Sequence, residues 1–231
     1  PIMFDATVKG QTVKAVASLA KTCYVYAFNR ETGKPLYPIV EMAVPTKSDV
    51  PNEEIYPTQP IPFNARSVPQ SPFCATFPSN VEDPKLQAQS RVMFTPPSSK
   101  ESLVISPGAV GGPNRGPSAF SPKTGWLYVT GKNDAMVLQA KPLTGPLKPG
   151  QNNPGHFQSF IEWKMSVGNA TQNIVAFDPS TGDPAWITEL KGSTNGGLLV
   201  TAGDVVFEAV GRDFYALDAK TGKKLAQVNI A

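Results

Sequence analysis

The chain has 231 residues, a formal net charge of +3 and charged side chains at only 17% of its positions. The positive charge is spread without a basic block, which argues against a nucleic-acid partner, because nucleic-acid interfaces cluster lysine and arginine with aromatic residues. No run of about 20 apolar residues is present, so we expect no transmembrane segment.

The first regular pattern lies near the N-terminus, where two apolar runs rich in β-forming residues occupy Val13–Leu19 and Cys23–Phe28. A short segment centred on Lys21 separates these runs, and this arrangement predicts a β-hairpin with Lys21 in its turn. The alternation of strand and turn is expected to continue as far as Pro38.

A long irregular segment follows at about 44–100 and is dense in proline, serine and asparagine. Proline accounts for 24 residues of the chain and is disfavoured in helices and central strands. Because most loops in compact domains are short, we interpret this segment as a long insertion within one domain that spans 1–231. Inside it, the stretch Asp83–Ser90 predicts a short helix.

Strand patterns resume after the insertion as short apolar runs, separated by residues that favour turns. The predicted strands are Ser102–Ile105, Trp126–Thr130, Val137–Gln139, Ser159–Val167, Asn173–Asp178, Ala185–Leu190, Gly196–Thr201, Val205–Val210, Phe214–Asp218 and Leu225–Ile230. This succession is typical of an all-β fold.

Three segments repeat one pattern, namely FNRETGKPLY at Phe28–Tyr37, FDPSTGDPAW at Phe177–Trp186 and LDAKTGKKLA at Leu217–Ala226. In each, an apolar strand ends at Asp or Asn, and Thr-Gly then forms a turn in which glycine is free to adopt a positive φ. Gly182 and Gly222 are 40 residues apart, a spacing typical of one four-stranded propeller blade.

The sequence therefore predicts an all-β fold, a β-propeller of four-stranded antiparallel blades. The predicted strands are enough for about four blades, roughly half of a complete ring. An incomplete ring leaves strand edges open. We therefore expect the remaining half to come from the same precursor, from a second chain or from self-association.

Cysteine and histidine are rare. Cys23 and Cys74 match no metal-binding spacing, so the simplest interpretation is two isolated thiols, with a disulfide left open. His156 is the only histidine, which excludes a metal site built on several histidines. It lies in a loop-like stretch, and we expect it to be solvated rather than catalytic.

Several motifs occur together in one order. AKTCYVYAFNRETGKPLY is followed by a proline-rich segment ending in PTQP, by FTPPS at Phe94–Ser98, by SPGAVGGPNRGPSAFSPKTGWLYV at Ser106–Val129, and by STNGGLLVTAGDVVFEAVGRDFYALDAKTGKKL at Ser193–Leu225. In this order they resemble the quinoprotein dehydrogenases that use pyrroloquinoline quinone (PQQ), with the closest likeness to the membrane glucose-dehydrogenase-like branch. The resemblance covers nearly the whole chain. It implies oxidation of a sugar or an alcohol, with electrons passed to a respiratory acceptor.

The resemblance implies four cofactor-binding residues. Lys21 lies where the family has a basic residue that contacts the quinone oxygens, and a cation there stabilises negative charge that develops on oxygen. Asn114, in GGPNRG, corresponds to an amide that contacts the cofactor. Asn195 and Gly196 match the Asn-Gly-Gly segment near the cofactor. Arg30 is left open between an ion pair and a site residue.

Four positions depart from the family pattern. Arg115 and Thr194 stand where the family has tryptophan, Cys23 replaces the glycine of a Lys-Thr-Gly turn, and Ala226 replaces a tryptophan that docks blades. These departures favour an alternative, in which the chain is a degenerate half-propeller that acts as a non-catalytic structural or protein-binding module. A hydrolase built on a propeller is a weaker alternative, because the chain has one histidine and no nucleophile motif.

In this family the catalytic Asp, which accepts the proton of the substrate hydroxyl, lies upstream of the lysine turn. The ligands of the family's Ca²⁺ also lie upstream, and Asp5 is too close to Lys21 to be the catalytic Asp. We therefore predict no catalytic and no metal-binding residue in this chain, and leave open whether it is an enzyme by itself. The resemblance implies a periplasmic or extracellular location, with any membrane association made through a missing part or a partner.

Overall fold

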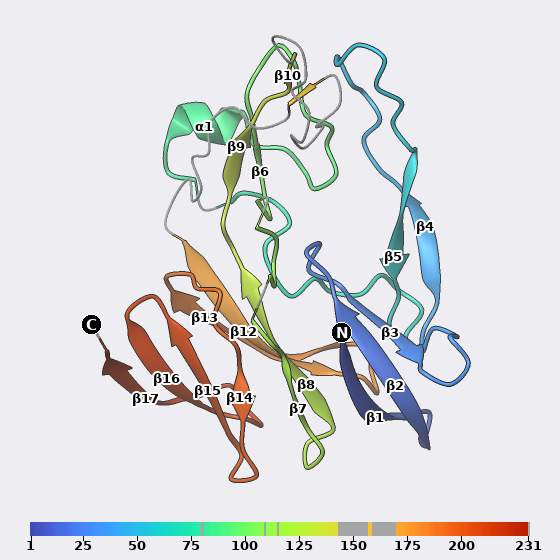
Figure 1. Ribbon diagram of the computed structural model, residues 1–231, viewed down its shortest axis with the longest axis vertical. Coiled ribbons are helices and arrows are strands. Elements are labelled where there is room, and N and C mark those ends of the chain that lie inside the picture. Colours follow the sequence, from blue (N-terminus) through green and yellow to red (C-terminus); the bar gives the residue numbers. More distant parts are fainter. Residues whose placement is uncertain (80, 109, 115, 143–156, 159–169, 231) are drawn as a thin grey trace, which may run out of the picture.

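The computed structural model describes the chain except for residues 80, 109, 115, 143–156, 159–169 and 231. Three antiparallel sheets lie side by side in the lower part of Figure 1. The first sheet contains β1 (Ile2–Val8), β2 (Gln11–Leu19) and β3 (Val25–Asn29). The second sheet contains β7 (Ala119–Ser121), β8 (Trp126–Lys132), β12 (Thr171–Asp178) and β13 (Asp183–Lys191). The third sheet contains β14 (Leu199–Val200), β15 (Val205–Val210), β16 (Asp213–Asp218) and β17 (Lys224–Asn229).

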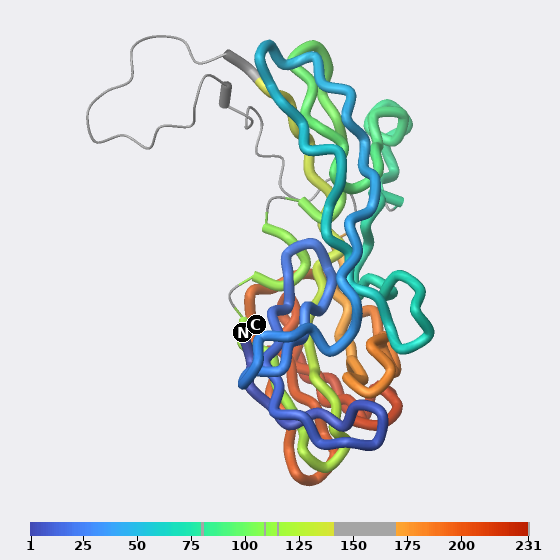
Figure 2. The backbone as a smooth tube through the Cα atoms, turned by 90° about the vertical axis from the view of Figure 1, so that its right-hand side faces the viewer, coloured from blue at the N-terminus to red at the C-terminus, as the bar shows by residue number. Residues whose placement is uncertain are grey.

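A second part of the chain projects beyond the sheets, as both Figure 1 and Figure 2 show. It contains the hairpin of β4 (Ile39–Ala43) and β5 (Thr58–Pro62), the pair β6 (Leu103–Ile105) and β9 (Met136–Leu138), the pair β10 (Lys141–Pro142) and β11 (Phe157–Gln158), and helix α1 (Pro84–Ala88). No helix among the described residues is long and apolar enough to cross a membrane.

The predicted all-β fold, a partial propeller of four-stranded antiparallel blades, is confirmed. The second and third sheets each contain four strands, and every pairing between named strands is antiparallel. The hairpin around Lys21 and the helix predicted within Asp83–Ser90 are also confirmed, the helix being capped by Asp83. The predicted strand Ser159–Val167 lies outside the described residues.

Two strand predictions are only partly met: the strand predicted at Gly196–Thr201 is limited to Leu199–Val200, and the strand pattern near Pro38 is interrupted. The strand expected to reach Pro38 is reduced to a single bridge between Phe28 and Pro35. Proline has no amide hydrogen, so Pro35 and Pro38 cannot donate the hydrogen bonds of a continuing ladder.

The second sheet is buried on both faces. Val175 and Phe177 of β12 pack toward the first sheet, while Ile174 and Ala176 pack toward the third sheet. These residues alternate along one strand because successive side chains of a strand point to opposite faces. The double burial is what a propeller blade between two neighbours requires.

The repeats dock one sheet on the next. The indole nitrogen of Trp186 donates a 3.0 Å hydrogen bond to the carbonyl oxygen of Ala219, in the turn of the third repeat. The hydroxyl of Tyr37 donates in the same way to Pro179, in the turn of the second repeat, at 3.1 Å. Tyr37 therefore performs the docking contact that Trp186 performs one sheet further on.

Candidate functional site

The four predicted cofactor-binding residues lie on three loops of the propeller part. Lys21 belongs to the turn between β2 and β3, Asn114 to the segment between β6 and β7, and Asn195 and Gly196 to the segment between β13 and β14. The side chains of Lys21, Asn114 and Asn195 are all exposed. Direct contacts between the loops bring these residues into one region.

The Lys21 turn packs on two glycines of the second loop. The amide of Gly112 donates a 2.9 Å hydrogen bond to the carbonyl oxygen of Lys21. Gly111 has a φ of +80°, and a Cβ there would lie 2.5 Å from the Cβ of Lys21. Glycine is therefore required for this close approach.

Asn114 faces a cavity of about 290 Å³. The cavity lies between the first sheet, which contributes Ile2, Ser18 and Leu19, and the 113–118 segment, which contributes Asn114 itself. A larger cavity of about 700 Å³ in the projecting part contains none of the four predicted residues.

The second loop also contacts the third. A Cβ at Gly116 would overlap the carbonyl oxygen of Gly196, so the two backbones touch without any intervening side chain. The amide of Leu198 donates a 3.0 Å hydrogen bond to the carbonyl oxygen of Pro117. The loop that carries Asn195 is therefore fixed against the loop that carries Asn114.

Lys132, the last residue of β8, contacts the loop that carries Asn195. It is only 4% exposed, and its ammonium group donates a hydrogen bond to Oδ1 of Asn195. Burial lowers the pKa of Lys132, and the nearby carboxylate of Asp134 opposes this effect. A buried cation thus holds the exposed amide of Asn195 in place.

Glu208, on β15, lies beneath the same loop and is 2% exposed. Its Oε1 accepts a 3.4 Å hydrogen bond from Gln172, whose own side-chain oxygen accepts a 2.9 Å bond from the amide of Thr194. Its Oε2 has no hydrogen-bond partner among the residues that the structure describes. Burial raises the pKa of Glu208 to about 7, and the Gln172 hydrogen bond only partly offsets this rise.

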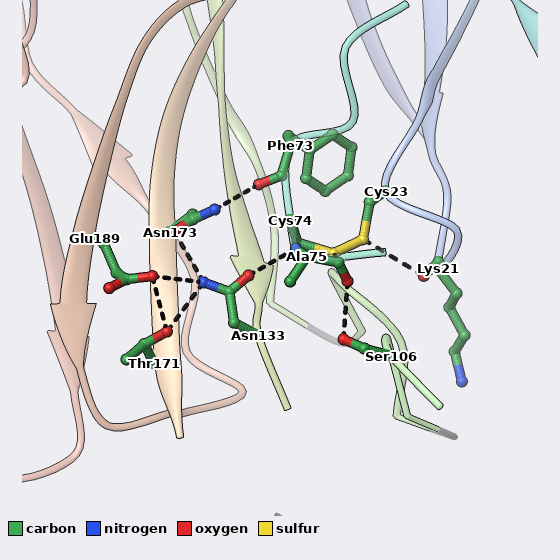
Figure 3. The surroundings of a disulfide bond; sticks show 10 residues. All are labelled: Lys21, Cys23, Phe73, Cys74, Ala75, Ser106, Asn133, Thr171, Asn173 and Glu189. Carbon is green, nitrogen blue, oxygen red and sulfur yellow. Dashed lines mark hydrogen bonds between the residues drawn. A yellow bond between two sulfur atoms is a disulfide. The ribbon is translucent and has the colours of Figure 1, made fainter. Parts of the chain in front are cut away.

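Figure 3 shows a polar network centred on Asn133, drawn on the opposite side of Cys23 and Cys74 from Lys21. The side-chain oxygen of Asn133 accepts a 2.8 Å hydrogen bond from the amide of Ala75. Its amide group donates to Thr171 and Asn173, each at 3.0 Å, and to Glu189 at 3.1 Å. These bonds join the segment around Ala75 to β12 and β13.

Sequence reasoning missed Lys132, Asn133 and Glu208. The signal for the first two was the polar run that directly follows the apolar residues of β8. The signal for Glu208 was its place as the only charged residue of β15. Neither signal says what these side chains contact.

The interpretation of two isolated thiols is wrong. Cys23 and Cys74 form a disulfide across 51 residues of sequence, and no cysteine is free. The amide of Phe73 donates a 2.9 Å hydrogen bond to the carbonyl oxygen of Cys23, so the backbone also holds the two cysteine-containing segments side by side. The sequence spacing alone could not show this proximity, because it depends on the path of the chain between the two cysteines.

Arg30 forms an ion pair. Its guanidinium lies 3.1 Å from the carboxylate of Asp5 and donates a 2.8 Å hydrogen bond to the carbonyl oxygen of Phe4. It therefore connects β1 to the first repeat. In the described residues no group of three or more His, Cys, Asp and Glu side chains could hold a metal ion; His156 and Arg115 lie outside those residues.

Comparison with known families places this chain. Residues 1–159 match the model of the glucose/ethanol/alcohol dehydrogenase β-propeller domain, PQQ. The chain belongs to this family. The resemblance to PQQ-dependent dehydrogenases is thereby confirmed. Residues 154–227 match a second propeller model, that of the outer membrane protein assembly factor BamB.

The curated relatives of this chain are dehydrogenases. The chain is 38% identical over 122 residues to the lanthanide-dependent methanol dehydrogenase of Methylorubrum extorquens, covering 52% of this chain and 20% of that protein. It is 28% identical over 230 residues to the putative dehydrogenase XoxF of Paracoccus denitrificans, and this match covers 97% of this chain and 33% of that protein. The chain thus spans about a third of the length of this full-coverage relative.

Solved structures show the same fold. The quinohemoprotein alcohol dehydrogenase of Comamonas testosteroni superimposes with a TM-score of 0.59 at 21% identity, over 99% of this chain and 30% of that one. A europium-containing methanol dehydrogenase gives a TM-score of 0.54 at 22% identity, and the match covers 99% of this chain and 34% of that chain.

Members of the PQQ family use a planar quinone that carries carboxylate groups. The donors on the three loops fit such a group, because Lys21 supplies a cation while Asn114 and Asn195 supply amides. The glycines at 111, 112 and 116 let these loops lie in contact, so their exposed side chains share one region. The buried Lys132 adds a second cation behind Asn195.

Proposed function

We propose that this chain forms part of the PQQ site of a PQQ-dependent dehydrogenase that oxidises a sugar or an alcohol and passes the electrons to a respiratory acceptor. The observation that supports this most directly is the convergence of the three loops that carry Lys21, Asn114, Asn195 and Gly196. These residues were selected from the sequence, and they lie on loops that contact one another.

In this proposal the side chains of this chain bind PQQ and orient it. When bound, PQQ supplies a quinone that accepts two electrons from the substrate. The ammonium group of Lys21 would hold the quinone oxygens and stabilise negative charge on them. Asn114 and Asn195 would donate their amide hydrogens to oxygens of the same group. Lys132 keeps the Asn195 side chain from rotating.

The general base and the metal ligands are proposed to come from another part of the propeller, in the same precursor, a second chain or a second copy. The length supports this, since the chain spans about a third of the length of its full-coverage relative.

A periplasmic or extracellular location is supported by the Cys23–Cys74 disulfide, since disulfides persist in oxidising compartments.

The alternative function is a non-catalytic structural or protein-binding module. Thr194, where the family has tryptophan, favours it. The amide of Thr194 bonds to Gln172 at 2.9 Å, and its hydroxyl accepts from the amide of Gly196 at 3.3 Å. These bonds give Thr194 a structural role within the loop that needs no cofactor.

Replacing Lys21 by alanine in the complete protein is expected to weaken PQQ binding at least about tenfold, since a charge-assisted contact contributes about 1.5–3 kcal/mol. The measurement is a fluorescence titration with PQQ. Lys14→Ala is the matched control, because Lys14 forms only an exposed ion pair with Glu31. Equal affinities of the Lys21 variant and the wild type would contradict the role given to Lys21.

The isolated 231-residue chain, supplied with PQQ and Ca²⁺, is expected to show no dye-linked oxidation of glucose or alcohols. The reason is that, in this proposal, the general base comes from another part of the propeller. A dye-reduction assay, run beside the complete protein, measures this. Turnover by the isolated chain would contradict the proposal that catalytic groups come from elsewhere.

A further inference from the structure

We propose that the Cys23–Cys74 disulfide positions the Lys21 turn within the cofactor site. The inference rests on the proposed function, because it explains how this chain holds a residue of that site. The disulfide joins the exposed turn to the segment around Ala75, which is bonded to the buried Asn133 network (Figure 3).

The backbone of Cys23 shows why the turn needs support. Cys23 has a φ of +67°, in the left-handed region that glycine adopts freely and other residues adopt at a cost of about 1–2 kcal/mol. In the turn that this sequence resembles, the same position is glycine. The chain therefore has a cysteine where the conformation favours glycine, and the bond to Cys74 opposes relaxation of that strained backbone.

The disulfide is enclosed by glycines. Cys23 is 0% exposed and Cys74 is 4% exposed. A Cβ at Gly112 would lie 2.6 Å from Sγ of Cys23 and 3.0 Å from Sγ of Cys74, so the bridge occupies the space that this glycine leaves. Gly112 is also the residue whose amide bonds to Lys21. The bridge, the glycine loop and the lysine turn are thus packed as one unit.

The far end of the bridge is firmly anchored. The carbonyl oxygen of Phe73 accepts a 3.1 Å hydrogen bond from Asn173, and the carbonyl oxygen of Ala75 accepts a 2.8 Å bond from Ser106. The amide of Ala75 donates to Asn133. Cys74 is therefore held between two residues that are hydrogen-bonded to the rest of the fold, and the disulfide connects the exposed Lys21 turn to this anchored segment.

Holding the turn should matter for binding more than for folding. A cation that is fixed before the ligand arrives loses less conformational entropy on binding than a mobile one. Breaking the disulfide retains the Lys21 side chain but allows the turn to move away from Gly111 and Gly112. The consequence expected is weaker PQQ binding, with the sheets themselves intact.

The test compares two double variants of the complete protein, Cys23→Ala/Cys74→Ala and Cys23→Gly/Cys74→Ala. The first removes the bridge and keeps the backbone strain, whereas the second removes the bridge and restores a residue that adopts positive φ freely. PQQ titration and amide hydrogen exchange are measured for both. We expect the first variant to bind PQQ at least about tenfold more weakly, and the second to recover part of the loss.

Amide exchange separates positioning from general stability. In the Cys23→Ala/Cys74→Ala variant we expect peptides covering 20–24 and 110–114 to exchange at least about tenfold faster, with the β12–β13 hairpin unchanged. Unchanged exchange at 110–114, or equal acceleration in β12–β13, would overturn the positioning role. If the wild type itself fails to bind PQQ, the proposed function fails, and the exchange pattern still decides whether the disulfide holds the turn.

Discussion

Replacing Glu208 by glutamine is expected to remove a pH dependence of stability and to make the protein about 3 kcal/mol more stable than the wild type at pH 8. Glu208 is 2% exposed, and within the described part of the chain one of its carboxyl oxygens has no hydrogen-bond partner. A buried carboxylate without a cation is costly, whereas a neutral amide of the same shape avoids the charge.

The sign follows from where the proton is held. Burial raises the pKa of Glu208 from 4.5 to about 7 in the folded protein. Between these values the folded state retains a proton that the unfolded state has lost, so the free energy of unfolding falls as pH rises through this range. Below about 4.5 both states are protonated, and above about 7 both are ionised, so the loss is then complete.

Denaturant unfolding of wild type and Glu208→Gln at several pH values between 4 and 8 measures this effect. The two curves should nearly coincide at pH 4 and separate as pH rises. Glu31→Gln is the control, because the Glu31 side chain is 57% exposed and its loss should not change the trend. Parallel curves for wild type and Glu208→Gln would show that Glu208 is not held protonated.

The repeats could be predicted because turn chemistry is local. Gly33, Gly182 and Gly222 all have the positive φ that the Thr-Gly pattern indicated. Trp186 and Tyr37 followed from the same repeats, but their docking on the next turn depends on how successive sheets pack. Strands such as β7 (Ala119–Ser121) were missed because three residues give too short a pattern to recognise.

The four predicted cofactor-binding residues came from the resemblance, whereas the residues that contact their loops did not. Lys132 contacts a residue 63 positions away, and Glu208 contacts one 36 positions away. Such contacts arise when neighbouring sheets pack, and no local pattern encodes them. The Cys23–Cys74 bond was unpredictable for the same reason, since its two cysteines are 51 residues apart in the sequence.

Replacing Gly116 by alanine is expected to destabilise the protein by about 2–3 kcal/mol and to weaken PQQ binding by the complete protein. The new Cβ would overlap the carbonyl oxygen of Gly196, a backbone atom that cannot rotate away. The loops must then separate, and the 3.0 Å hydrogen bond from Leu198 to Pro117 is stretched or lost. Asn195 would move away from Asn114 as a result.

Gly203→Ala provides the matched control for this change. A Cβ at Gly203 would meet its nearest neighbour, Oγ1 of Thr201, at 3.6 Å, which is an ordinary contact. Stability and PQQ affinity should therefore remain close to wild type, within about 0.5 kcal/mol. Thermal unfolding and fluorescence titration of both variants measure the difference. If Gly116→Ala binds PQQ as tightly as Gly203→Ala, contact between the Asn114 and Asn195 loops is not needed for the site.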